Sequence, residues 1–175
     1  LSRLSTCYTR LPGSTEATVM DDPSDSQFAR PRTFLSGGGG LVSTAADYLR
    51  FCEMLRRGGE LDGARLLGPR TVAYMTRNHL PDERDLASLA MPGAFSETRY
   101  DGVGFGLGFY VVTDPVRAQV PTSPGEYGWG GLASTAFWVV PAEDLVVIFL
   151  TQLVPSTTFD FRGQLKAIIH SAIID

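Results

Sequence analysis

The clearest pattern of apolar and polar positions in the first half of the chain is helical. Apolar residues recur there at positions i, i+3, i+4 and i+7, namely Tyr48, Phe51, Cys52 and Leu55. Thr44 and Asp47 have the spacing of a helix N-cap and its acidic partner, and Gly58 is typical of a helix end. We therefore expect an amphipathic helix here, and a second helix that begins at Pro69 and runs to about Asn78.

The last third of the chain has the pattern of strands followed by a helix. Glycine alternates with bulky residues in the first of four expected strands, which cover 104–112, 127–131, 133–140 and 145–152. A turn at 141–144 joins the last two, which should pair antiparallel. Helical spacing then predicts a terminal helix over 159–174 that covers one face of the sheet. Its apolar stripe consists of Phe161, Leu165, Ile168, Ile169 and Ala172.

Four further segments are short or irregular. Residues 3–9 alternate between polar and apolar and predict a strand, whereas the stretch from there to about residue 35 has no periodicity. Asp62-Gly63 predicts a hairpin turn, and 81–101 is expected to be a loop with one short helix at most.

These elements predict an α+β fold, an antiparallel sheet flanked by helices. We expect an extended strap at 1–35 and one structural unit at 36–175. That unit would hold the helices of 44–78, the sheet of 103–152 and the terminal helix.

Composition excludes several classes of function. At 43% hydrophobic and 19% charged, the 175 residues suit one globular domain or a large part of one. A net charge of −4 disfavours nucleic acid as a partner, and the longest apolar run, 145–150, is far shorter than the roughly 20 residues of a membrane span. The chain starts at Leu1 without an initiator Met, so we expect a missing amino-terminal part. The lack of a signal peptide favours a cytoplasmic location.

The familiar catalytic and metal-binding motifs are absent from the 175 residues. No Gly-x-Ser-x-Gly is present, and Ser-x-x-Lys cannot occur because the only lysine, Lys166, follows Gly163 by three positions. Tyr-x-Asn and Ser-x-Asn are absent too. His79 and His170 have no ligand-spaced partners, so we expect both to be structural, with no metal and no cofactor. The glycine run at 37–40 lacks the Gly-Lys-Ser/Thr ending of a phosphate loop, which leaves nucleotide binding the least favoured function.

Three segments together resemble the carboxy-terminal half of the serine β-lactamase and penicillin-binding-protein superfamily, in particular its family VIII-type esterase branch. They are SGGGGLVSTAADYLRF at 36–51, GVGFGLGFY at 102–110 and EYGWGGLASTAFWVVPAEDLVVIFLTQ at 126–152. The resemblance implies a partial β-lactamase/transpeptidase-like fold that lacks its amino-terminal part, where the family carries its Ser-x-x-Lys nucleophile and its Tyr-x-Asn element.

The resemblance also implies a site. Trp129-Gly130-Gly131 matches the third active-site motif of the esterase branch, where glycine lets a scissile carbonyl lie beside the strand. The backbone N–H of Leu132 would be an oxyanion donor. Ser36 and Gly37 would line the entrance. A tryptophan in place of the family's lysine or histidine removes a cation, which favours neutral esters over anionic lactams.

The function implied is that of a serine hydrolase fragment acting on ester or β-lactam/amide acyl groups through an acyl-enzyme. Its partner in the full-length enzyme would be a small-molecule ester or lactam. Without the nucleophile the chain is expected to be inactive alone, and its exposed sheet surface predicts self-association. The alternative is a non-catalytic, penicillin-binding-like module that holds a peptide or a cell-wall fragment.

Overall fold

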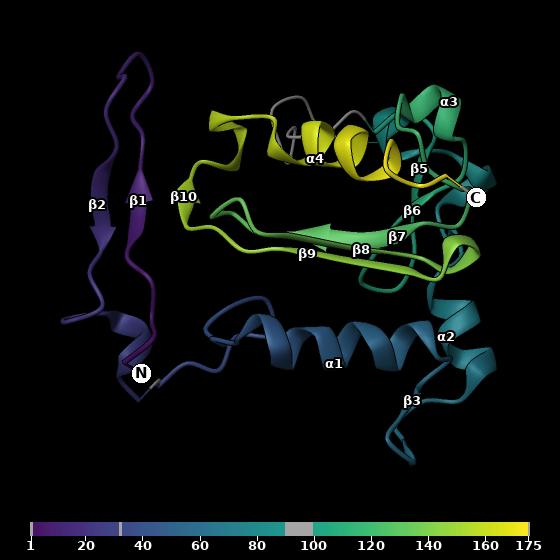
Figure 1. Ribbon diagram of the computed structural model, residues 1–175, viewed down its shortest axis with the longest axis horizontal. Helices are drawn as coiled ribbons and strands as arrows, with labels where there is room; N and C mark the ends of the chain where they lie inside the picture. Colours follow the sequence, from purple (N-terminus) through teal and green to yellow (C-terminus); the bar gives the residue numbers. More distant parts are fainter. Residues whose placement is uncertain (1, 32, 90–99, 175) are drawn as a thin grey trace.

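The computed structural model describes residues 2–31, 33–89 and 100–174 and shows an α+β fold (Figure 1). A five-stranded antiparallel sheet lies at the centre, with α1 (Ala45–Arg56) along one face and α4 (Phe161–His170) along the other. The predicted fold class is confirmed. No helix among the described residues is long and apolar enough to cross a membrane.

Helix α1 begins as the sequence predicts. Thr44 Oγ1 accepts a hydrogen bond from the Asp47 N–H at 3.1 Å, which caps the helix. Cys52 and Leu55 of the expected stripe are buried, but Phe51 is 40% exposed and Met54 is buried in its place. The buried face is therefore rotated slightly from the one that the apolar spacing indicates.

The segment after α1 also follows the prediction closely. Strands β3 (Glu60–Leu61) and β4 (Ala64–Arg65) form a hairpin whose turn residues, Asp62 and Gly63, have φ of 50° and 78°. Positive φ at both central residues is the geometry that Asp-Gly favours. Helix α2 (Pro69–Met75) starts at the expected proline and ends three residues before Asn78.

The central sheet contains β5 (Val103–Phe105), β6 (Tyr110–Val112), β7 (Tyr127–Gly130), β8 (Ala136–Val140) and β9 (Leu145–Phe149), in that order. The prediction of one continuous strand over 104–112 was wrong, because β5 and β6 form a hairpin. Gly108 has a φ of +94° in the connection, and the Gly106 N–H donates to Phe109 O at 2.8 Å. A Cβ at Gly104 would overlap Asn78, so this glycine allows the chain that follows α2 to approach the strand closely.

A second, smaller sheet involves the segment predicted to be a strap. Strand β1 (Cys7–Thr9) confirms the expected strand and pairs in parallel with β10 (Leu153–Val154). Strand β2 (Thr18–Asp21) pairs antiparallel with β1, and a 3₁₀ turn follows at Gln27–Ala29. The absence of periodicity hid β2, because this strand is held by pairing with β1 and is mostly exposed. A domain boundary near residue 35 stays a prediction.

The remaining elements are short. Helix α3 (Pro115–Ala118) was not expected. Part of the predicted 81–101 loop contains two 3₁₀ turns, Pro81–Glu83 and Leu86–Ser88, while 90–99 lie outside the described residues. Two more such turns follow at Pro141–Glu143 and Ser156–Thr158.

Helix α4 is shorter than predicted and presents a different face to the sheet. Asp160 caps it by accepting from the Gly163 N–H at 2.9 Å. Ile168, expected on the buried stripe, is 65% exposed, whereas Lys166 and His170 are buried. Strand β8 lies between the two helices and is buried along its whole length. Its residues alternate, with Phe137 and Val139 in the core on the α1 side.

Candidate functional site

Strand β7 carries the Trp-Gly-Gly motif at the place where its pairing changes. Strand β6 pairs with β7 only at Tyr127 and Gly128. On the other side, β8 follows β7 as far as Gly130, which is opposite Ala136. The part of β7 that bears the motif therefore extends past the β6 pairing, as a strand edge would if it were to receive an extended ligand.

Space beside the motif glycines is occupied by the protein itself. A Cβ at Gly130 would overlap the Arg162 guanidinium, and one at Gly131 would overlap Thr135 Oγ1. These glycines were expected to give a substrate access to the strand. On the α4 face, the Arg162 side chain fills the space beside Gly130.

Arg162 fixes the turn between β7 and β8. Its Nη2 donates hydrogen bonds to the carbonyl oxygens of Gly131 and Thr135, both at 3.1 Å. The Gly131 N–H also donates to Thr135 O, at 2.9 Å, which closes the turn. Arg162 thus attaches both ends of this turn to α4.

This anchoring sets the direction of the Leu132 N–H. The Gly131 carbonyl and the Leu132 N–H belong to one trans peptide group, so they point in opposite directions. Since the carbonyl points toward Arg162, the N–H points away from it. No described residue accepts a hydrogen bond from this N–H, and Leu132 is 69% exposed. The peptide therefore offers an unused, accessible donor.

Trp129 lies against Phe105, with ring centroids 5.4 Å apart at an interplanar angle of 71°. Trp129 and Gly130 line a cavity of about 360 Å³ between the central sheet and α4. Ser36 contributes to a different hollow, next to Phe34 and the glycines that follow it, and its Oγ accepts from the Gly38 N–H at 3.2 Å. The structure thus does not bring Ser36 and Gly37 into the cavity beside Trp129. Their role at an entrance stays a prediction.

A buried polar cluster lies on the α4 side of the sheet, and sequence reasoning missed it. Lys166 forms an ion pair with Glu126, and the Tyr110 hydroxyl donates to the same Glu126 Oε1 at 2.7 Å. Burial, with the Glu126 carboxylate next, raises the pKa of the Tyr110 hydroxyl well above its ordinary value. A signal was present, because the only lysine of the chain directly follows Leu165 of the predicted apolar stripe.

A second polar group does not have the order of a catalytic triad. Ser123 Oγ donates to Glu143 Oε1 at 2.8 Å, and His170 Nδ1 lies 3.2 Å from Glu143 Oε2. The carboxylate stands between the hydroxyl and the imidazole, so His170 is not placed to take the serine proton. Within the described part of the chain, no cluster of three or more His, Cys, Asp or Glu side chains could hold a metal ion.

The sheet between two helices, with the Trp-Gly-Gly strand in it, fits the serine β-lactamase and penicillin-binding-protein superfamily. The chain belongs to the Beta-lactamase family, whose model matches residues 2–170. The resemblance of the motif segments to this superfamily is thereby confirmed.

Two curated relatives support this assignment. The chain is 34% identical over 165 residues to esterase EstB of Burkholderia gladioli, a match that covers 93% of the chain and 36% of EstB. It is 38% identical over 133 residues to protein Rv1367c of Mycobacterium tuberculosis, which covers 74% of the chain and 32% of that protein. The chain therefore spans about a third of the length of these relatives.

Solved structures show the same fold. EstCE1, described as a hydrolase with promiscuous acyltransferase activity, superimposes with a TM-score of 0.73 at 24% identity, over 97% of the chain and 44% of EstCE1. Simvastatin synthase LovD of Aspergillus terreus gives a TM-score of 0.74 at 20% identity, over 97% of the chain and 42% of LovD. At these identities the likeness concerns the fold alone.

Proposed function

We propose that this chain forms one wall of the acyl-binding cleft of a serine esterase. The observation that carries the proposal is the unused Leu132 N–H, directed away from Arg162 at the end of the Trp-Gly-Gly strand. A donor held in this way can stabilise the negative charge that develops on a carbonyl oxygen during acyl transfer. The similarity to esterase EstB supports the choice of an ester substrate.

The chemistry requires groups outside the 175 residues. A serine of a Ser-x-x-Lys motif would lose its proton to the lysine or tyrosine base and attack the ester carbonyl carbon. The carbonyl oxygen then carries the charge, to which the Leu132 N–H donates. Collapse of this intermediate expels the alcohol, which takes up the proton, and leaves an acyl-enzyme that water hydrolyses to acid and free serine. The chain alone is inactive in this scheme.

Kinetics with p-nitrophenyl butyrate test the proposal. The isolated chain should give no burst of p-nitrophenol, whereas the chain extended by the polypeptide encoded upstream in its own gene should give one. In that extended protein, Leu132→Pro removes the N–H and should lower kcat about 10²- to 10³-fold. Leu132→Ala keeps the N–H and is the matched control, with a kcat within about threefold of the parent. Equal rates for the two variants would contradict the assigned donor.

A non-catalytic module that binds a peptide or a cell-wall fragment is the second candidate. The extension of β7 past its pairing with β6 favours it, because such an edge can receive an extended peptide. An upstream sequence without Ser-x-x-Lys, together with saturable binding of a cell-wall peptide, would support this module over the esterase.

Self-association is a further part of the proposal. Strand β9 is at the edge of the central sheet, and its outer side pairs with no strand of the described segments. Unpaired edges favour addition of another strand. Sedimentation of the 175-residue chain over a range of concentrations should show dimers or larger species, and a monomer at all concentrations would contradict this.

A further inference from the structure

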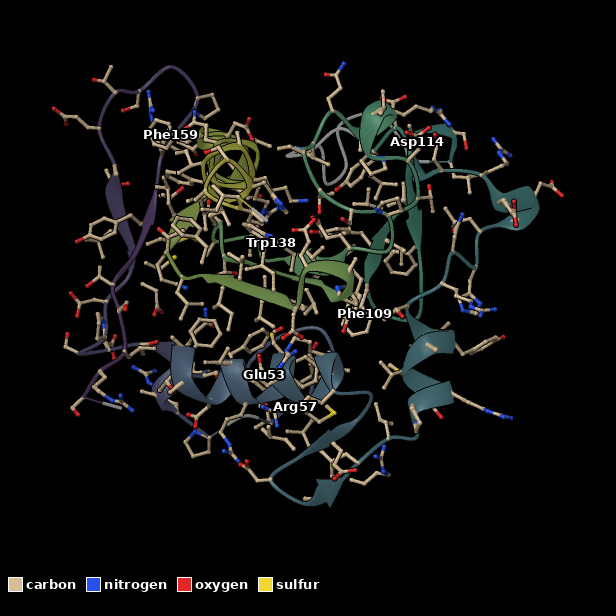
Figure 2. The ribbon with its side chains drawn as sticks, turned by 45° about the vertical axis from the view of Figure 1, so that its right-hand side comes forward. Glu53, Arg57, Phe109, Asp114, Trp138 and Phe159 are labelled. Atoms are coloured by element: carbon tan, nitrogen blue, oxygen red, sulfur yellow. The ribbon has the colours of Figure 1, made fainter. Side chains whose placement is uncertain are left out.

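The cavity between the central sheet and α4 has the size and walls of a small-molecule pocket. Its volume of about 360 Å³ lies within the range of ligand sites. Apolar side chains from β5, β6 and the region of α3 form one wall: Val103, Val112, Ala118 and Val120. Trp129 and Trp138, the only two tryptophans of the chain, both line it. Figure 2 shows Trp138 on the α4 side of the sheet.

Lys166 brings a buried charged group to the cavity, opposite its apolar wall. The side chain lines the cavity and is only 9% exposed. An ammonium has three N–H donors. Glu126 and the Tyr110 hydroxyl oxygen accept two of them, the latter at 3.3 Å. The ring of Trp138 lies 5.5 Å from Nζ and stabilises the charge, but no described oxygen or nitrogen accepts the third N–H.

The charges around the cavity determine which ligand suits it. Lys166 and Arg162 supply two positive charges, and Glu126 and Asp160 supply two negative ones. A carboxylate placed on Lys166 would be brought close to Glu126, which already neutralises the ammonium. Because Glu126 is fully buried, this repulsion is weakly screened and therefore costly. A ligand cation would be repelled by Lys166 itself, so a neutral ligand is favoured.

We propose that this cavity binds a neutral, compact apolar group that carries one hydrogen-bond acceptor, with the acceptor on Lys166 Nζ. Aryl ketones and aryl esters belong to this chemical class. Trp129 and Gly130 line the same space, so the bound group would be part of the ester substrate of the proposed hydrolase. This assignment of substrate class rests on the proposed function, whereas binding itself does not.

Binding can be measured on the 175-residue chain by nuclear magnetic resonance. Trp138 lies on the α4 face and lines the cavity, so its indole N–H signal reports on binding there. The Trp129 ring packs against Phe105 and the core on the α1 side, and its signal serves as an internal reference. Three probes of similar size are titrated: acetophenone, ethylbenzene, which lacks the acceptor, and benzoate, which is an anion. Acetophenone should shift the Trp138 signal to saturation and bind at least about tenfold more tightly than either other probe.

A paired substitution tests whether Lys166 is the donor. Lys166→Met together with Glu126→Gln removes both charges and keeps the side-chain volumes close to the original. The preference for acetophenone over ethylbenzene should fall to less than about threefold. Arg50→Gln, in an exposed ion pair with Asp62, is the control and should leave the preference unchanged.

The outcomes separate clearly. Each of four results would overturn the proposal. Three come from the unmodified chain: no saturable shift with any probe, equal affinities for acetophenone and ethylbenzene, or tighter binding of benzoate. The fourth is a preference for acetophenone that survives the paired substitution. The comparison of probes on the unmodified chain decides the matter even where the double variant does not fold. Since binding needs no nucleophile, failed hydrolysis of p-nitrophenyl butyrate would count against the proposed function and not against this pocket.

Discussion

The two faces of the central sheet are built on different principles. On the α1 face, Cys52 and Leu55 pack against Phe137 and Val139 in a continuous apolar core. On the α4 face, a buried ion pair and a cavity interrupt the apolar packing around Trp138. The first face contributes stability mainly through apolar burial. The second contains the cavity and the arginine that fixes the β7–β8 turn, so specific chemistry is concentrated there.

The largest expected effect comes from breaking the ion pair of the α4 face. Lys166→Met leaves the Glu126 carboxylate buried without its cation, which should lower the free energy of unfolding by about 3–5 kcal/mol. Adding Glu126→Gln to the same chain should restore most of the loss, because no uncompensated charge remains. Urea denaturation of the three proteins measures both changes.

The α1 face provides the comparison. Leu55→Ala should cost about 2–5 kcal/mol through lost burial and the cavity it creates. Unlike the loss from Lys166→Met, this loss of stability should not be recovered by a second substitution that only removes a charge. Two results together would contradict this difference between the faces. Lys166→Met would lower the free energy of unfolding less than Leu55→Ala does, and Glu126→Gln would restore none of the stability lost in Lys166→Met.

A smaller effect is expected from the anchor of the β7–β8 turn. Arg162→Gln weakens the hydrogen bonds to Gly131 O and Thr135 O and should lower the free energy of unfolding by about 1–3 kcal/mol. The Gly131 amide, which is bonded within this turn, should exchange its hydrogen faster, as mass spectrometry or NMR would show. Arg50→Gln is the control, with a change below about 0.5 kcal/mol. Unchanged exchange at Gly131 would show that α4 does not hold the turn.

The smallest effect concerns a buried thiol of the α1 face. Burial raises the pKa of Cys52 to about 12 from its ordinary 9.0. The folded state therefore keeps a proton that the unfolded state releases. The associated stability is complete below pH 9 and is lost as the pH rises toward 12. Through this thiol, the free energy of unfolding should fall by at most about 1.4 kcal/mol between pH 9 and 10.

Two variants isolate this slope. Cys52→Ala should make the loss between pH 9 and 10 smaller. Much of the remainder comes from three tyrosines whose pKa values burial also raises, Tyr48, Tyr110 and Tyr127. Cys7→Ala should retain most of the loss, since Cys7 is only partly buried. Denaturation at pH 8, 9 and 10 gives the comparison. A slope that is the same in all three proteins would assign the pH dependence to other groups.

The two faces also differ in how far the sequence predicts them. Thr44 and the apolar spacing after it locate α1, and Asp62-Gly63 locates the β3–β4 turn, because caps and tight turns depend on neighbouring residues. The burial of Lys166 depends on Glu126, which is distant in the chain and opposite in charge. A pattern of hydrophobic and polar positions does not show which distant residue will pair with a buried charge.

The candidate site was predictable to a similar degree. The motif around Trp129 identified the strand, and the structure places that strand beside a cavity. Arg162 could not be assigned to the β7–β8 turn in advance, since it lies on a helix 27 to 31 positions after the carbonyls that it binds, and main-chain carbonyls have no sequence signature. The division of 104–112 into two strands could not be predicted, because Gly108 fits the alternating pattern of one strand. Its positive φ, which turns the chain between β5 and β6, is not visible in the sequence.

The parallel pairing of β1 with β10 has a consequence for the order of events on the ribosome. Tyr8 has its strand partner at Leu153, so the beginning of this chain is synthesised long before the residues that receive it. Until β10 emerges, β1 lacks its parallel partner and, within these 175 residues, pairs with β2 alone; a two-stranded hairpin is marginally stable in water. The segment of β1 and β2 therefore lacks this pairing, and is exposed to chaperones and proteases, while the residues between β2 and β10 are made.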